Sequence, residues 1–186
     1  SSRDGSLSLI YKYSKSGRLK VFALSANDKQ GVNIDRAEYD GVFNGNSSNN
    51  LFNLRHSDII AADLLIKNSI SFNGHTNKWK LGLINLKQTD NVLKFRSEIE
   101  YQLQKKIKLA AGMETEHRER KYLGIIPEEE YDIRPEGTGE KINASIRNYR
   151  IGGYAELEFN DLLEAVKLFL VVGSRLDAFP GLGRIW

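Results

Sequence analysis

The chain of 186 residues contains no cysteine, which excludes disulfide scaffolds, zinc ribbons and thiol catalysis. Long apolar runs are also missing, and the longest candidate, residues 168–172, falls far short of the ~18 residues of a membrane-spanning helix. The charges nearly balance, because 27 Lys and Arg face 24 Asp and Glu, and a net charge of +3 is too small for a dedicated nucleic-acid binder. The 40% hydrophobic and 27% charged residues are typical of a folded chain, with one domain over residues 1–186.

Apolar residues recur at every second position over residues 93–104, which is the period of a β-strand with two unlike faces. Leu93, Phe95 and Ile99 fall on one face, whereas Lys94 and Glu98 fall on the other. The pattern resumes over residues 107–116, so the two segments are predicted to form a hairpin. Similar alternation near residues 7–13, 18–25, 64–72, 79–83, 149–159 and 166–179 brings the total to about eight strands.

The predicted strands are long and their connections differ in length. Several strands run about 11 to 14 residues, against about five to six in soluble sheets and about 9 to 11 in membrane barrels. Turns are expected at residues 14–17, 73–77, 105 and 160–164, with a further short connection at 88–91, and long loops near residues 26–57 and 120–146. The sequence therefore predicts an all-β fold, an antiparallel meander of long strands that forms all or part of a transmembrane β-barrel.

Two alternatives remain open at this stage. Residues 97–122 are rich in helix-forming residues, and residues 57–66 and 161–164 carry helix-capping patterns, so each segment is a candidate helix. The alternation is also compatible with a soluble barrel or sandwich whose apolar face points inward.

If the apolar face contacts lipid, the opposite face lines a watery lumen. Both signs of charge are interspersed on that face, as expected for a wall that contacts water, a plug or an interior ion-pair network. The residues predicted to face the lumen are Lys94, Arg96, Glu98, Glu100, Glu114, Glu116, Arg118, Glu156, Glu158 and Arg175.

The sequence RIGGYAELEF at residues 150–159, followed by GSRLDAFP at residues 173–180, resembles the barrel of TonB-dependent outer-membrane receptors. Residues 93–100 and 2–12 are similar to other strands of that family. The resemblance implies import of a small nutrient, such as a ferric siderophore, cobalamin or a glycan, across the bacterial outer membrane. Family barrels have about 22 strands and an N-terminal plug domain. This chain contains no plug, so we expect a portion of the barrel that contacts outer-membrane lipid, with the plug and TonB engaged through the missing part.

Residues 1–6 lack the basic and apolar regions of a signal peptide, so the chain is expected to be cytosolic, already processed or cut from a longer protein. A stand-alone eight-stranded outer-membrane barrel acting in adhesion or structure, and a soluble β-rich binding module, remain as alternative functions. Under the membrane interpretation, Tyr131, Asp132 and Arg134 are the candidate ligand contacts of an outer loop.

No enzymatic site, cofactor or metal site is predicted. On a strand, His117 would face away from Glu114 and Glu116, which breaks a chelate. The acidic residues 128–130 are typical of a solvated loop, and three scattered histidines support no Ser-His-Asp arrangement. The carboxylate pairs at 98/100 and 156/158 have a separation that glycosidases also use, but no sugar cleft is recognisable around them.

Overall fold

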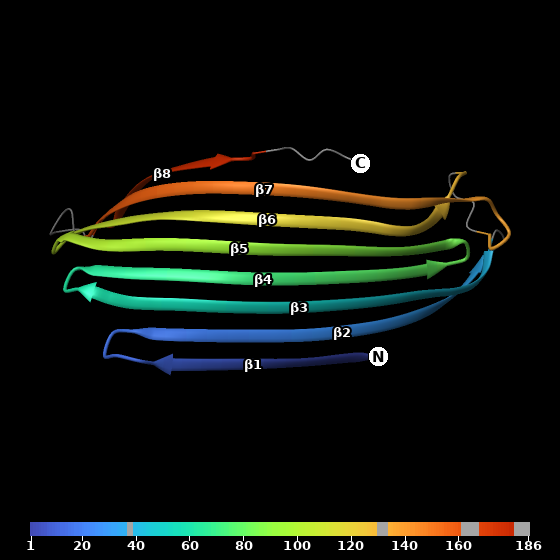
Figure 1. Cartoon of the computed structure of the whole chain (residues 1–186), viewed down its shortest axis with the longest axis horizontal. Helices are drawn as coiled ribbons and strands as arrows, with labels where there is room; N and C mark the ends of the chain where they lie inside the picture. The colour runs from blue at the N-terminus through green and yellow to red at the C-terminus, as the bar shows by residue number, and fades with distance from the viewer. Residues whose placement is uncertain (37–38, 130–133, 161–167, 181–186) are drawn as a thin grey trace.

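The computed structural model describes residues 1–36, 39–129, 134–160 and 168–180, which form one antiparallel sheet whose eight strands lie in sequence order (Figure 1). The predicted all-β meander of long strands is therefore confirmed. No helix in the described ranges has the length and apolar character needed to cross a membrane. The strands are β1 (Ser2–Lys12), β2 (Arg18–Arg36), β3 (Tyr39–Ala61), β4 (Leu64–Leu81), β5 (Ile84–Gln104), β6 (Ile107–Pro127), β7 (Gly139–Phe159) and β8 (Leu170–Ala178).

The sheet has two ends, which we call rims. The near rim carries the connections at residues 13–17, 62–63 and 105–106, on the left of Figure 1, and the far rim carries those after β2, β4 and β6.

The turns at 14–17 and 105 are where the sequence predicts them. The predicted loop at 26–57 is wrong, because residues 26–36 belong to β2 and residues 39–57 belong to β3. The loop at 120–146 is shorter than predicted, because β6 continues to Pro127 and β7 begins at Gly139.

Three other sequence predictions also need correction. The expected turn at 73–77 lies inside β4, and the short connection expected at 88–91 lies inside β5. The candidate helices at 57–66 and 97–122 are strands apart from their tight turns, whereas residues 161–164 lie outside the described residues. In each strand the backbone groups pair with two neighbouring strands, with a register shift only beside the tight turns, at 59/61 and 102/104. This extended pairing outweighs the local propensity for a turn or a helix.

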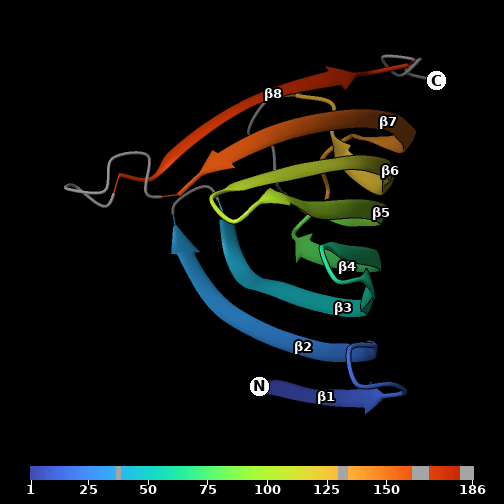
Figure 2. The ribbon, with the colours of Figure 1, turned by 90° about the vertical axis from the view of Figure 1, so that its left-hand side faces the viewer.

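The sheet is curved and open. Figure 2, seen along the strands, shows β1 and β8 at opposite ends of an arc, and each of these strands pairs with only one neighbour. β2 to β7 have 18 to 23 residues each, about 60 to 75 Å at 3.3 Å per residue. The backbone groups on the outer edges of β1 and β8 are therefore available to pair with further strands.

This sheet has no hydrophobic core of the usual kind. Within the described residues, Val92 and Ala110 are the buried hydrophobic residues, and Ser57 is a buried polar one. The pairing registers put these three residues on the same face as the charged side chains of β5 and β6. The fold is consequently a single layer with two accessible faces rather than a sandwich.

The two faces differ in an unusual way. The acidic side chains of Glu98 and Glu116 are only 13% and 16% exposed, beneath the more exposed Lys94 and Arg96 with which they pair. Phe95 and Ile99, on the other face of the same strand pair, are 39% and 41% exposed. Side chains converge on the concave side of a curved sheet and diverge on its convex side. The covered carboxylates therefore assign the charged face to the inside of the curve. We call it the inner face, and the apolar one the outer face.

Apolar residues on the outer face form a belt that starts near the near rim and ends sharply. On β5 the belt runs from Leu103 to Leu93, ten residue steps or about 33 Å along the strand, which becomes a height of about 25 Å at a strand tilt of about 40°. Its last row consists of cross-strand neighbours, and every residue in the row beyond it is small or polar. The last apolar row is Leu7, Ala23, Phe52, Phe72, Leu93, His117 and Tyr149, and the row beyond it is Gly5, Ser25, Asn50, Gly74, Asn91, Glu119 and Arg147.

A polar cluster closes the first near-rim turn. The Tyr13 hydroxyl donates to Asp58 Oδ2 at 2.7 Å, and the Ser16 hydroxyl donates to Asp58 Oδ1 at 2.8 Å. The hydrogen bond to the carboxylate raises the pKa of the Tyr13 phenol above its usual value. These contacts tie the turn between β1 and β2 to β3 and so fix the start of the meander.

Candidate functional site

The ten residues predicted to face the lumen all lie on the inner face. Alternation puts the even-numbered residues of β5 and β6 on that face, and register then aligns Lys94 with Glu116 and Arg96 with Glu114. Glu156, Glu158 and Arg175 join them through the pairing of β6 with β7 and of β7 with β8. The alternation read from sequence thus identified one continuous polar wall.

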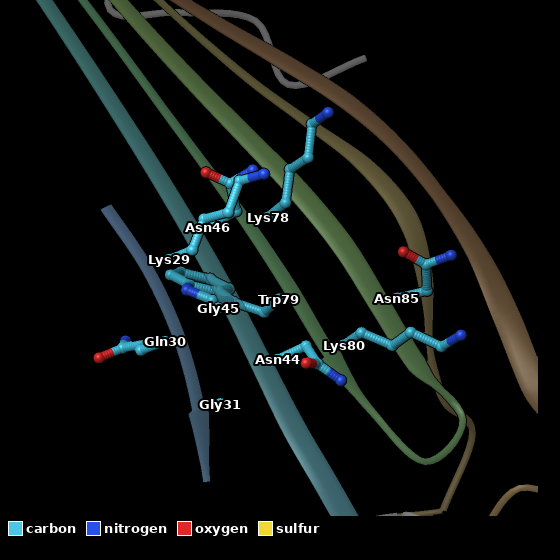
Figure 3. Close-up of a pocket in the computed structure, with 10 residues that line it drawn as sticks. All are labelled: Lys29, Gln30, Gly31, Asn44, Gly45, Asn46, Lys78, Trp79, Lys80 and Asn85. Carbon is cyan, nitrogen blue, oxygen red and sulfur yellow. The ribbon is translucent and has the colours of Figure 1, made fainter. Parts of the chain in front are cut away.

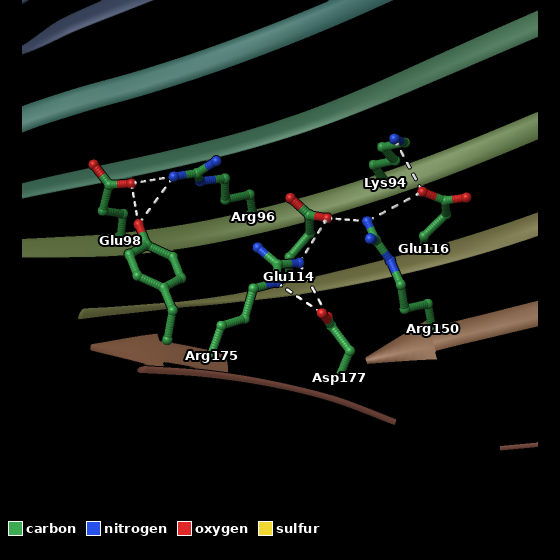
Figure 4. Close-up of polar contacts among 9 residues, drawn as sticks. Lys94, Arg96, Glu98, Glu114, Glu116, Arg150, Arg175 and Asp177 are labelled. Carbon is green, nitrogen blue, oxygen red and sulfur yellow. Dashed lines mark hydrogen bonds and ion pairs between the residues drawn. The ribbon is translucent and has the colours of Figure 1, made fainter. Parts of the chain in front are cut away.

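One ionic network begins on β4 and ends on β7. Lys67 Nζ lies 3.1 Å from Glu98 Oε1 and also pairs with Glu100. Arg96 Nη2 donates to Glu98 Oε2 at 2.6 Å and to the Tyr154 hydroxyl at 2.9 Å. The Tyr154 hydroxyl in turn donates to Glu98. Figure 4 shows the Arg96 and Glu98 side chains of this network pointing toward each other.

A glycine makes the contact of Tyr154 with Glu98 possible. Gly112 lies on β6 directly between Glu98 and Tyr154 in the register. A Cβ atom at this position would lie 2.6 Å from the Tyr154 ring and 2.9 Å from the Ser97 carbonyl oxygen. The absence of a side chain therefore lets the Tyr154 ring cross β6 and connect β7 to β5.

A second network links β5 to β8. Lys94 Nζ lies 2.9 Å from Glu116 Oε2, and Arg150 contacts both Glu114 and Glu116. Arg175 Nη2 lies 3.8 Å from Glu114 Oε1, across β7. The same guanidinium binds Asp177 through Nε and Nη2, at 2.8 and 3.0 Å (Figure 4).

The crossing of β7 again depends on a glycine. Gly152 lies between Glu114 and Asp177 in the register, and a Cβ there would collide with the Asp177 carboxylate and lie 3.3 Å from Arg175.

Because the ion pairs of both networks are partly exposed, each contributes about 0–1 kcal/mol to stability. Their main effect is to hold long charged side chains flat against the wall, so the inner face remains polar without carrying an excess of either charge.

The balance of charge ends at β4. On β2 and β3, Lys20 and Arg55 are direct cross-strand neighbours on the inner face, and neither has a side-chain partner among the described residues. Arg18 Nε donates to the buried Ser57 hydroxyl at 2.8 Å. A pocket of about 450 Å³ lies here, lined by the basic residues Arg18, Arg55, Lys67 and Arg96 and by one acidic residue, Glu98, which pairs with Lys67 and Arg96. This basic pocket is the part of the inner face best suited to bind a carboxylate or phosphate group.

Several inner-face residues were missed by the site prediction. Lys67 alternates with apolar residues in the segment 64–72, and Tyr154 has the same parity as Glu156 and Glu158, so alternation could have found both. Arg18 and Arg55 could have been found only from the register, because the predicted loop at 26–57 hid the pairing of β2 with β3.

Of the three candidate loop contacts, the structure describes Arg134. Tyr131 and Asp132 lie outside the described residues, and Arg134 lies in the far-rim connection between β6 and β7, where its carbonyl accepts a hydrogen bond from Gly137 N at 3.0 Å. Glu156 lies on the inner face but makes no ion pair with another described residue.

The histidine and the glutamates of residues 114–117 lie on opposite faces of β6. His117 lies on the outer face, where its ring stacks on Tyr149 with centroids 4.4 Å apart, while Glu114 and Glu116 lie on the inner face. The predicted separation of these side chains is confirmed. Across the described parts of the chain, no three His, Cys, Asp or Glu side chains are grouped so that they could hold a metal ion.

No protein-family model matches the chain, and no curated protein sequence matches it either.

Proposed function

We propose that this chain forms part of the barrel wall of a TonB-dependent outer-membrane transporter, which binds and imports a small nutrient. The observation that carries the proposal is the contrast between the two faces, with ion-paired carboxylates covered inside the curve and apolar side chains uncovered outside it. In water this arrangement would leave a large apolar surface unpaired. In a bilayer the same surface contacts hydrocarbon, and the ionised face contacts a water-filled lumen.

The dimensions of the belt support the same environment. Its height of about 25 Å equals the apolar band of outer-membrane barrels. The strands continue well beyond the belt only toward the far rim, while the near rim has tight turns. Because such barrels have short periplasmic turns and longer extracellular extensions, we place the near rim in the periplasm and the far rim outside the cell.

The open edges favour a large barrel over the two alternatives. A stand-alone eight-stranded barrel needs β1 to pair with β8, and the strand order leaves both as edges. A soluble binding module would have to cover the outer face, where Leu176 is 80% exposed and Leu7 is 64% exposed. Further strands of a larger barrel would satisfy β1 and β8 and keep the outer face toward lipid.

The basic pocket indicates the chemistry of the transported nutrient. Lys20 and Arg55 face each other across two strands, and like charges in that position repel unless an anion lies between them. Within the nutrient classes of this family, the pocket favours one that carries carboxylate or phosphate groups.

Uptake by cells tests the proposal. A bacterial strain without the gene is supplied with the full-length protein and given a radiolabelled ferric siderophore, cobalamin or malto-oligosaccharide. We expect uptake of one probe that disappears when TonB is deleted. Arg55→Gln should reduce this uptake, while Arg3→Gln, on the outer face of β1, should leave it unchanged. Recovery of the protein in the soluble fraction, or equal uptake of all three probes with and without the gene, would refute the proposal.

A further inference from the structure

A cluster of lysines lies on the outer face beyond the apolar belt, toward the far rim. Lys29 of β2, Asn46 of β3, Lys78 of β4 and Lys87 of β5 are successive cross-strand neighbours in one row. Lys80 lies in the next row. A pocket of about 410 Å³ opens between these strands, and Figure 3 shows the residues that border it. Buried Gly45 forms part of the pocket wall, so backbone rather than a side chain lies at this point.

These lysines differ from the charged residues of the inner face. Lys29, Lys78, Lys80 and Lys87 are exposed, and none of them has an acidic partner in the described part of the chain. Lys78 and Lys87 lie directly opposite each other, a position in which like charges destabilise a sheet. The other residues in the pocket wall with polar side-chain amides are three asparagines and Gln30, whose amide groups can donate to an anion but cannot neutralise a lysine. The cluster therefore lacks a counter-charge within the chain.

The position of the cluster identifies the source of that counter-charge. Phe72 is the last apolar residue of the belt on β4, and Lys78 follows it by six residues on the same face, about 20 Å along the strand and about 15 Å above the belt at a tilt of about 40°. The headgroup layer of a phospholipid bilayer adds only about 7 Å on each side. A headgroup that reaches the lysines must therefore be larger than that of a phospholipid.

We propose that this lysine cluster binds the phosphate groups of a glycolipid, in which phosphorylated sugars form the headgroup above the outer leaflet. The inference rests on the proposed function, because the height of the cluster is measured from a belt that lies in the outer membrane. Clustered lysines beside a membrane attract anionic headgroups, and the asparagines supply donors to the sugar and phosphate oxygens. The bound lipid replaces the missing counter-charge between Lys78 and Lys87.

Lipid binding in detergent tests this site without any need for transport. The full-length protein in a nonionic detergent is titrated with a diphosphorylated glycolipid, and bound lipid is counted by native mass spectrometry. Each lysine beside an anionic headgroup contributes about a factor of five in affinity. The double variant Lys78→Gln, Lys80→Gln should therefore bind the lipid about 30-fold more weakly, and the dephosphorylated lipid should bind wild type no better than this variant.

A matched control separates the cluster from general surface charge. Lys141→Gln removes an exposed, unpaired lysine from the same face, on β7, and should leave lipid affinity within about twofold of wild type. Heat-modifiable mobility on gels confirms that each variant keeps its folded barrel. Equal loss in the double variant and in the control, or equal binding of phosphorylated and dephosphorylated lipid by wild type, would overturn the inference. Neither result depends on nutrient uptake, so the transport proposal is tested separately.

Discussion

Replacing Tyr154 by phenylalanine removes a single hydroxyl group from the inner face. That hydroxyl donates to Glu98 and accepts a hydrogen bond from Arg96 at 2.9 Å, so the change deletes two contacts with charged groups. Hydrogen bonds to charged groups contribute about 1.5–3 kcal/mol, but water can partly replace them here because Tyr154 is only half-buried. We expect the free energy of unfolding to fall by about 1–2 kcal/mol, a factor of about 5 to 30 in the folded-to-unfolded ratio.

The measurement is urea unfolding of the full-length protein in liposomes, followed by heat-modifiable gel mobility. Tyr149→Phe is the matched control, because Tyr149 lies on the outer face of the same strand and its hydroxyl has no hydrogen-bond partner among the described residues. This control should cost less than about 0.5 kcal/mol. Equal costs for the two variants, or no measurable cost for Tyr154→Phe, would refute the connection of β7 to β5 across Gly112.

Two further substitutions test the faces and the glycine crossing by the same unfolding assay. Ile99→Arg places a charge in the apolar belt and should cost about 2–4 kcal/mol in a bilayer, whereas Asn53→Arg on the inner face should cost less than about 1 kcal/mol. A cost that does not depend on the face would contradict the assignment. Gly112→Ala puts a Cβ 2.6 Å from the Tyr154 ring and should cost about 1–3 kcal/mol. The Cβ that Gly153→Ala adds would lie 3.7 Å from its nearest atom, so this variant should change the free energy of unfolding by less than about 0.5 kcal/mol. Similar changes for the two alanine variants would argue against the crossing of β6 by the Tyr154 ring.

Strand type and face could be predicted from sequence where alternation is strict. Over β5, each of Lys94, Arg96 and Glu98 lies on the face that its parity predicts, and the register carries the same assignment to β6 and β7. This works because the side-chain period of a strand is two, so a single correct residue fixes the face of its whole segment.

Strand ends could not be predicted in the same way. Asn73 and Gly74 form a strong turn signal in isolation, yet Gly74 pairs with Asn50 on one side and Asn91 on the other. These residues lie in or beside the first polar row past the apolar belt. Their small and polar character marks the end of the apolar belt on the outer face, rather than a reversal of the chain. The Asn-rich segment 44–50 lies in β3 rather than in the predicted loop for the same reason.

The basic pocket and the lysine cluster depend on register and could not be derived from a linear pattern. Arg18, Lys20 and Arg55 approach one another only because β2 pairs with β3 over its full length, and Lys78 meets Lys87 only through the pairing of β4 with β5. Each lysine or arginine taken singly is an ordinary exposed residue. Together they form basic sites because they have no acidic neighbours on the adjacent strands, and this arrangement exists only in the folded sheet.

The most direct test of the account is the environment of four neighbouring side chains on β5. Nitroxide spin labels are placed one at a time at Phe95, Arg96, Glu98 and Ile99 of the full-length protein in lipid vesicles, and their collisions with oxygen and with a water-soluble nickel complex are measured. We predict that labels at Phe95 and Ile99 collide with oxygen dissolved in the lipid, and that labels at Arg96 and Glu98 collide with the nickel complex. Water at Phe95 and Ile99, with lipid or dry protein at Arg96 and Glu98, would contradict the proposed orientation of the sheet.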